Sequence, residues 1–173
     1  MKRDNELKKQ YDALVAQYHT DLYRYGYWLT KDKQVTEDIV QETFLRAWRS
    51  IEQLQDIKAA KGWLITILRR ENARRFERKQ LSLVDIDDYS VADDDESQQQ
   101  TSIEKEELHV AINMLADDYK EPLIMQAMFG YSGEEIATEL GLNKNTVMTR
   151  LFRAKKQLAE LIKSNVVSRT VET

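Results

Sequence analysis

Two short basic stretches hold many of the anion-binding side chains in this chain. Residues 63–79 contain six cations against two acids, and residues 144–163 contain six cations against one acid. Arginine contacts phosphate in a bidentate manner and stacks on bases, and a helix N-terminus attracts the anionic groups of DNA. Local basic patches, rather than net charge, make a nucleic-acid footprint. The net charge of −4 is therefore compatible with DNA binding.

The second basic stretch lies in a helix-turn-helix pattern. Ser132 and Glu135 have the spacing of a capping box, and Gly141 can end that first helix in the left-handed conformation. Asn143 is a good N-cap for a second helix. Its apolar face recurs every three or four residues, at Val147, Leu151, Ala154, Leu158 and Leu161. An ordinary helix pair with a solvated basic face is the alternative, but cations beside small polar residues at the second helix start favour insertion into the major groove.

The first basic stretch is predicted to be a helix of its own. Gly62 is expected to stop a loop over residues 52–62, and Trp63 to start the helix. Its apolar side comprises Trp63, Leu64, Ile67, Leu68 and Phe76. So many arginines in a chain of negative net charge favour contact with DNA or RNA over a merely solvated face.

Two helices are predicted upstream. Residues 7–29 carry an aromatic stripe that we interpret as core, and Thr36 can cap the next helix. The buried face of that helix is predicted to comprise Ile39, Val40, Phe44, Ala47, Trp48 and Ile51. Leu45 falls outside this face and hints at a partner, although the residues alone favour a solvated surface.

The composition predicts an all-α protein of two small helical domains, because Gly and Pro are scarce and Leu, Glu and Lys are abundant. The first domain is predicted over residues 1–80 and the second, with the helix-turn-helix, over residues 104–173. Between them, residues 81–103 hold seven acids and no cation before Ile103, and we predict a flexible acidic linker there. Residues 166–173 are predicted to fray.

Several function classes are disfavoured. No run of about 18 apolar residues predicts a membrane span, and the polar N-terminus does not resemble a signal peptide. Cysteine is absent, which fits a reducing, cytoplasmic compartment. There is no nucleophile motif or Gly-rich phosphate loop, and His19 and His109 stand alone. We therefore expect no enzyme, no metal site and no cofactor.

Three motifs occur in an order that resembles a known family. They are DIVQETFLRAWRS (residues 38–50), WLITILRRENARRFERK (residues 63–79) and YSGEEIATELGLNKNTVMTRLFRAKKQL (residues 131–158). Together they resemble the sigma-70 family of bacterial RNA polymerase sigma factors, specifically its extracytoplasmic-function (ECF) group. The resemblance covers about residues 10–163.

The resemblance implies a promoter-specificity subunit without catalysis of its own. It would bind core RNA polymerase through the β′ clamp helices and the β flap, recognise the −10 and −35 promoter elements and assist strand opening to initiate transcription. The resemblance also implies an anti-sigma factor as a further partner. The loop of residues 51–62 would hold a flipped base of the −10 non-template strand.

The resemblance also assigns residues to three surfaces. The polymerase-binding residues would be Asp38, Gln41, Glu42, Leu45 and Arg46. The −10 DNA contacts would be Arg69, Arg70, Arg74, Arg75, Arg78 and Lys79. The −35 DNA contacts would be Lys144, Asn145, Met148, Thr149, Phe152 and Arg153.

Some residues depart from the family pattern. Arg70 and Arg74 stand where members often have Asn and Asp, which suggests more backbone contact in the −10 region. Met148 and Thr149 offer few hydrogen bonds, so −35 recognition would depend on DNA shape. The main alternative is an autonomous helix-turn-helix regulator with an N-terminal sensor or dimerisation domain, which would bind a palindromic site without polymerase. An enzyme and an RNA-binding adaptor are weaker alternatives.

Overall fold

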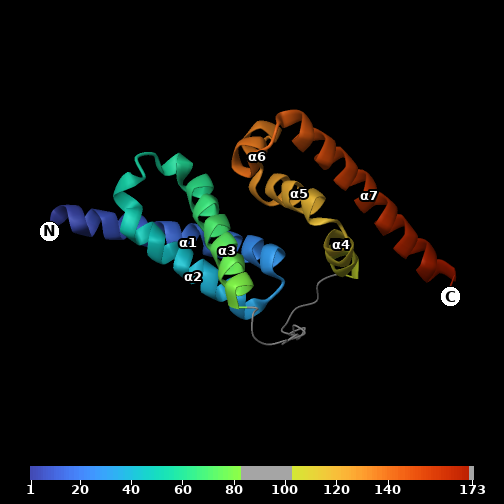
Figure 1. Ribbon diagram of the computed structural model, residues 1–173, viewed down its shortest axis with the longest axis horizontal. Coiled ribbons are helices and arrows are strands. Elements are labelled where there is room, and N and C mark those ends of the chain that lie inside the picture. Colours follow the sequence, from blue (N-terminus) through green and yellow to red (C-terminus); the bar gives the residue numbers. More distant parts are fainter. Residues whose placement is uncertain (83–102, 172–173) are drawn as a thin grey trace. The chain divides into compact units, whose positions relative to one another are not determined.

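The computed structural model describes residues 1–82 and 103–171, and within them every regular element is a helix (Figure 1). The contacts divide the chain into two compact units, residues 1–94 and 95–173. The predicted all-α class is therefore confirmed. The predicted flexible acidic linker lies, apart from its ends, outside the described residues, and the domain limits stay a prediction.

Residues 1–82, the described part of the N-terminal unit, form three α-helices and two short 3-10 helices. They are α1 (Lys2–Thr30), α2 (Lys33–Ser50), η1 (Ile51–Gln53), η2 (Ile57–Ala59) and α3 (Ala60–Ser82). Each α-helix contributes apolar side chains to the core, including Leu22, Phe44 and Leu68. Gly26 permits α1 and α2 to approach closely, because a Cβ there would lie 3.2 Å from the Thr36 side chain.

The start of α2 differs from the prediction. Asp32, not Thr36, is the N-cap, and its carboxylate accepts a hydrogen bond from the Val35 amide at 3.0 Å. Thr36 is instead fully buried inside the helix, where its hydroxyl donates to the Asp32 carbonyl at 2.6 Å. Both residues are good capping types, so their types alone did not identify the helix start.

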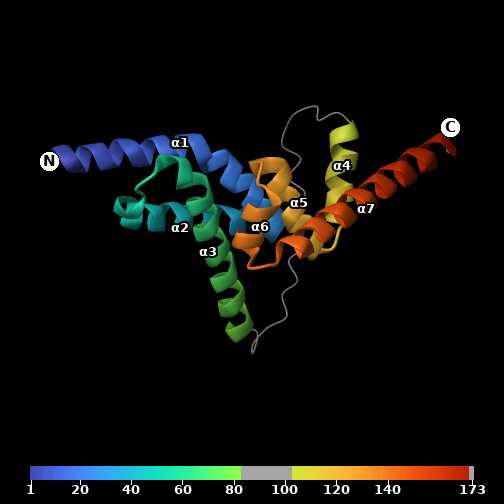
Figure 2. The same cartoon turned by 90° about the horizontal axis from the view of Figure 1, so that it is seen from above.

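Two further predictions in this unit were wrong. Trp48 was assigned to the buried face, but it is 43% exposed. Gly62 was expected to stop the loop, but it lies inside α3, which begins at Ala60. Ile65, absent from the predicted apolar side of α3, is fully buried beside Leu64. In Figure 2 the C-terminal end of α3 projects away from α1 and α2, and residues 77–81 are exposed.

In the C-terminal unit the described residues 103–171 form four helices: α4 (Ile103–Asn113), α5 (Asp117–Phe129), α6 (Gly133–Leu140) and α7 (Lys144–Val171). Helix α7 contacts the other three, and its C-terminal part extends past them (Figure 2). It continues to Val171, where fraying from residue 166 was predicted, because residues 166–171 contain no Gly or Pro to end it. The described helices include none that is long and apolar enough to cross a bilayer.

Local sequence signals determine the helix ends in this unit. The capping box is confirmed: the Glu135 amide donates to Ser132 Oγ at 3.2 Å, and the Ser132 amide donates to Glu135 Oε2 at 2.7 Å. Gly141 is left-handed, with φ of 64°, and ends α6 as predicted. At the α4–α5 junction, Lys120 is 3% exposed and its ammonium donates to the Asn113 carbonyl at 3.3 Å. These contacts hold the short connections that orient α7.

Candidate nucleic-acid and polymerase interfaces

Helix α7 carries the six predicted −35 residues along one exposed face. Asn143 caps the helix as predicted, because its Oδ1 accepts from the Asn145 amide at 2.8 Å. The six residues recur in pairs every four positions, and all are exposed: Lys144, Asn145, Met148, Thr149, Phe152 and Arg153. Between the pairs, Val147 and Leu151 are buried, whereas Thr146 is exposed and Arg150 is half-buried. The structure thus brings this set together, while its contact with DNA stays a prediction.

The first turn of α6 touches this face at two points. Lys144 Nζ lies 2.8 Å from Glu134 Oε1, and this hydrogen bond together with the positive charge lowers the pKa of Glu134. A Cβ on Gly133 would lie 2.7 Å from the sulfur of Met148. Gly133 and Glu134 were not among the predicted site residues, since no local pattern signals a contact between residues on different helices.

A recess of about 520 Å³ borders the same face. It is lined by Ala116, Asp118, Tyr119, Asn145, Thr146, Thr149, Arg150 and Arg153. Arg150, which was not among the predicted contacts, lies 3.7 Å from the Asp118 carboxylate at the recess. Lys144 and Arg150 therefore each have an acidic neighbour on a helix that precedes α7.

Tyr131, which leads into α6, has a buried hydroxyl without a hydrogen-bond partner in the described structure. Burial, and then the nearby Glu139 and Glu135, raise its pKa to about 12. The hydroxyl is therefore neutral across the physiological range and contributes no hydrogen bond to this unit.

The predicted polymerase-binding residues lie on α2, with unequal exposure. Asp38 and Gln41 are exposed, and Leu45 is 45% exposed, which confirms that it lies outside the core. Glu42 and Arg46 are half-buried and lie 3.3 Å apart as an ion pair. This face therefore combines exposed polar groups with the exposed apolar side chain of Leu45, and Trp48 on the same helix is 43% exposed.

A groove of about 540 Å³ runs between α1 and α2 beside these residues. It is lined by Tyr11, Val15, His19, Tyr23, Glu37, Val40, Gln41, Phe44 and Leu45. The His19 ring stacks on Phe44, with centroids 5.9 Å apart, and Tyr11 donates to the Phe44 carbonyl at 3.1 Å. Burial, more than the neighbouring Asp12, raises the pKa of Tyr11. Aromatic residues around the core stripe of α1 thus line an accessible groove.

Helix α3 distributes its six predicted DNA contacts around its axis. Arg70, Arg74 and Arg78 are four residues apart and share one strip. Arg75 lies over the Phe76 ring, with its guanidinium carbon 4.8 Å from the ring centroid. Two residues of the predicted set, Arg69 and Arg75, are half-buried. The other four are exposed: Arg70, Arg74, Arg78 and Lys79. The set therefore does not form a single face.

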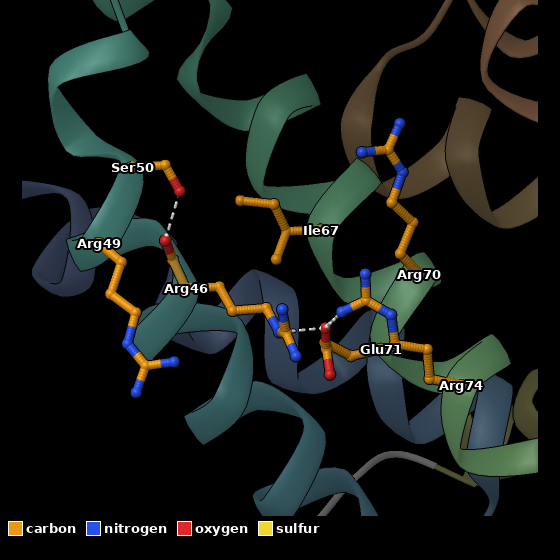
Figure 3. Close-up of a pocket in the computed structure, with 7 residues that line it drawn as sticks. All are labelled: Arg46, Arg49, Ser50, Ile67, Arg70, Glu71 and Arg74. Carbon is orange, nitrogen blue, oxygen red and sulfur yellow. Dashed lines mark hydrogen bonds and ion pairs between the residues drawn. The ribbon is translucent and has the colours of Figure 1, made fainter. Parts of the chain in front are cut away.

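Glu71 joins the α2 and α3 sets at one buried carboxylate (Figure 3). It is 6% exposed, and its Oε1 lies 2.7 Å from Arg74 Nη1 and forms an ion pair with Arg46 Nε. Arg46 was assigned to polymerase and Arg74 to DNA, yet both guanidinium groups converge on this acid. Sequence reasoning missed Glu71 as a linking residue, although its spacing of three from Arg74 was visible.

The connection between α2 and α3 is part of the core. Ile51 and Leu54 pack with Leu14 and Ala60, whereas Ile57 is 52% exposed. The capture of a flipped base by residues 51–62 stays a prediction. Among the residues that the structure describes, no group of three His, Asp or Glu side chains could hold a metal ion.

Comparison with known proteins shows that the chain is similar to one family. The family model of sigma-70 region 2 matches residues 14–81, and that of sigma-70 region 4 matches residues 105–158. The chain is 31% identical over 156 residues to RNA polymerase sigma factor SigV of Bacillus subtilis, covering 90% of this chain and 93% of that relative. Identity to the ECF RNA polymerase sigma factor SigX of the same organism is 27% over 161 residues, covering 88% and 83% of the two chains.

Solved structures have the same fold. The sigma factor RpoE of Bartonella quintana, in complex with the anti-sigma factor NepR, matches with a TM-score of 0.70 and 24% identity over 90% of this chain and 98% of that one. CnrH, in complex with the cytosolic domain of CnrY, matches with a TM-score of 0.59 and 22% identity over 89% and 88%. The two family regions, SigV and relatives named as ECF sigma factors establish that this chain belongs to the ECF group of the sigma-70 family, the promoter-recognition subunits of RNA polymerase.

Proposed function

We propose that this sigma factor recognises promoters through three separate surfaces. Helix α2 docks on the β′ clamp helices of core RNA polymerase, α3 with residues 51–62 holds the −10 strand and assists its opening, and α7 reads the −35 element. The C-terminal unit also contacts the β flap. The main observation behind this proposal is the exposed face of α7. Three pairs of side chains suited to a DNA groove lie there, spaced four residues apart, and the opposite side of the helix is buried.

The docking of α2 is supported by the exposure of Leu45. An apolar side chain at 45% exposure beside polar groups can supply the apolar centre of a partner contact that has a polar rim. Asp38, Gln41 and Glu42 can add polar contacts around it. Arg46 contributes less to this surface, because its guanidinium binds Glu71.

The −10 and −35 surfaces are expected to differ in how they read DNA. Arginine on α3 favours backbone contacts, which position the strand without reading its sequence. On α7, Arg153 and Asn145 can contact base edges or phosphates, while Phe152 can make apolar contacts in the groove. The two domains, residues 1–80 and 104–173, would be joined by a flexible linker over residues 81–103 so that both promoter elements are reached.

A regulatory partner and a cytoplasmic location complete the proposal. The Bartonella quintana relative was solved with an anti-sigma factor, and we expect a protein of that kind to cover the α1–α2 groove and the Leu45 surface. The absence of cysteine fits a reducing compartment. The chain itself supplies binding surfaces and no catalysis.

The test is a pull-down of core RNA polymerase with wild-type protein, Leu45→Asp and the matched control Leu81→Asp. Leu81 is 81% exposed at the end of α3, so both variants add one charge at an exposed leucine. We expect wild type and Leu81→Asp to bind, and Leu45→Asp to bind at least tenfold more weakly, about 1.4 kcal/mol. Wild type that binds duplex DNA strongly but has no polymerase affinity would instead support the autonomous regulator.

A further inference from the structure

The first turns of α1 lie outside the part of the chain that matches the family. The sigma-70 region 2 match begins at residue 14, whereas α1 begins at Lys2, so residues 2–13 form N-terminal turns that precede the match. In Figure 1 the N-terminal end of α1 projects beyond α2 and α3. Most side chains of these turns are exposed, but Leu7, Gln10 and Tyr11 are half-buried. Because a short helical end is held mainly by packing, these three mark the side on which the N-terminal turns are held.

The N-terminal turns pack on the connection between α2 and α3. Leu7 and Tyr11 lie against a buried cluster that joins α1 to this connection and to the start of α3: Leu14, Ile51, Leu54 and Ala60. Arg3 adds an ion pair to the same connection, because its Nη2 lies 3.3 Å from Glu52 Oε1. That pair is exposed and contributes little by itself. The apolar contacts are therefore the main link between the N-terminal turns and the connection.

The connection depends on side-chain packing for its position. Its regular structure consists of the two short 3-10 helices η1 and η2, and hydrogen bonds in 3-10 helices have poorer geometry than those in α-helices. Residues 55–59 are exposed between the buried Leu54 and Ala60. This exposed segment is thus held at its two ends, and both ends belong to the cluster on which Leu7 packs.

We propose that the N-terminal turns of α1 position residues 55–59 for base recognition in the −10 strand, with Leu7 and Arg3 as positioning residues. The proposal rests on the function proposed above and deepens it, because it gives a part of α1 that precedes the family match a role in sequence recognition. Leu7 acts through the cluster, since a shift of Leu54 or Ala60 moves the segment between them. Leu7 and Arg3 do not themselves contact the base.

Hydrogen–deuterium exchange of the full chain, followed by mass spectrometry, tests the positioning without DNA. Leu7→Ala removes the apolar contact, so we expect exchange in peptides covering residues 51–60 to become several-fold faster through local opening. Peptides from residues 64–72 of α3 should keep their wild-type rates. Unchanged exchange over residues 51–60 would overturn the proposal. Exchange that becomes equally faster in both regions would also overturn it, because the turns would then contribute only general stability.

Matched variants separate this contact from its surroundings. Leu7→Ile keeps an apolar side chain of the same volume and should keep the wild-type exchange rates. Arg3→Ala removes the ion pair with Glu52 and should change exchange in the same direction as Leu7→Ala, by a smaller factor. Lys9→Ala removes an exposed cation from the same turns and should change nothing. An effect of Lys9→Ala as large as that of Leu7→Ala would contradict the assignment to Leu7.

Base preference tests the consequence for promoter recognition. Holoenzyme assembled from core polymerase and each variant selects from single-stranded DNA with a randomised −10 element, and the bound strands are sequenced. We expect Leu7→Ala to lower the preference several-fold at the position of the captured base, and to leave the other positions and the affinity for core polymerase unchanged. A purely structural role would lower the preference at all positions together.

The two measurements distinguish failure of this inference from failure of the proposed function. If wild type selects bases and Leu7→Ala selects them identically, the positioning role is rejected and the promoter function stands. If wild type selects no bases but Leu7→Ala still speeds exchange over residues 51–60, the N-terminal turns do position the connection, and the promoter role assigned to it is rejected.

Discussion

The two basic helices, α3 and α7, hold their cations in different ways. On α3, Arg74 shares with Arg46 a carboxylate, Glu71, that is 6% exposed. On α7, Lys144 and Arg150 pair with Glu134 and Asp118, whose side chains are each 74% exposed. We therefore expect substitutions of basic residues in the N-terminal unit to affect both stability and DNA binding, and those in the C-terminal unit to affect DNA binding with little effect on stability.

Removing the buried acid is expected to have the largest effect on stability. Glu71→Gln leaves Arg46 and Arg74 without their shared partner, so the free energy of unfolding of the N-terminal unit should fall by about 2 kcal/mol, reduced from the buried-pair value because both arginines are partly exposed. All three tryptophans, Trp28, Trp48 and Trp63, lie in this unit, so their fluorescence during urea unfolding reports it selectively. An unchanged urea midpoint would show that the ion pairs of Glu71 on α3 contribute no more to stability than the exposed pairs on α7.

Gly133→Ala tests whether recognition by α7 is separable from stability. The new Cβ would lie 2.7 Å from the sulfur of Met148, and a flexible methionine end can move away at a cost below about 1 kcal/mol. We therefore expect only a small change in the thermal unfolding temperature. The sequence preference for the −35 bases that Met148 is predicted to contact should change, measured by binding to a library of −35 duplexes. In the Met148→Ala background Gly133→Ala should have no further effect, and equal effects in both backgrounds would contradict the contact.

Tyr131→Phe is expected to stabilise the C-terminal unit by about 1 kcal/mol, because it removes a buried hydroxyl that lacks a partner. The folded pKa of Tyr131 is about 12, above its ordinary value of 10.0. Its neutral form is therefore favoured by folding, a contribution that is complete below pH 10 and lost as pH rises toward 12. Circular dichroism in urea from pH 8 to 11.5 should show the gain in stability of the variant growing with pH.

The smallest expected effect on stability is that of Glu134→Gln. The Lys144–Glu134 pair is exposed and screened by solvent, so its loss should leave the free energy of unfolding almost unchanged. The released lysine should instead strengthen binding to a −35 duplex a few-fold and steepen the logarithmic salt slope by up to about 0.9. Glu134→Asp, which keeps the charge, is the control. A stability loss equal to that of Glu71→Gln would show that the two helices do not differ.

The sequence predicted the parts of the fold that depend on neighbours along the chain. The capping box at Ser132, the left-handed Gly141 and the buried face through Val147 and Leu151 all follow from spacings of three or four residues. The start of α2 was predicted wrongly because Asp32 and Thr36 are both residue types that cap helices. In the structure Asp32 is the N-cap, and Thr36 is buried inside the helix.

Contacts between helices could not be predicted in the same way. The sequence placed Arg46 and Arg74 in separate sets, and only the packing of α2 on α3 brings them to Glu71. The approach of Gly133 to Met148 likewise depends on the angle between α6 and α7. Residue types and spacing thus predict which helix carries a surface, whereas its shape depends on helix packing.

The rate at which the buried Lys120 is acylated can report how often the α4–α5 junction opens. An acylating reagent needs a solvent-accessible, unprotonated amine, so it should modify exposed lysines such as Lys144 quickly. Lys120, 3% exposed, can react only while the junction is transiently open. The rate at which mass spectrometry finds its acylated form therefore reports how often α4 separates from α5. The same acylation rate, measured with polymerase bound, would show whether binding to polymerase makes the α4–α5 junction open less often.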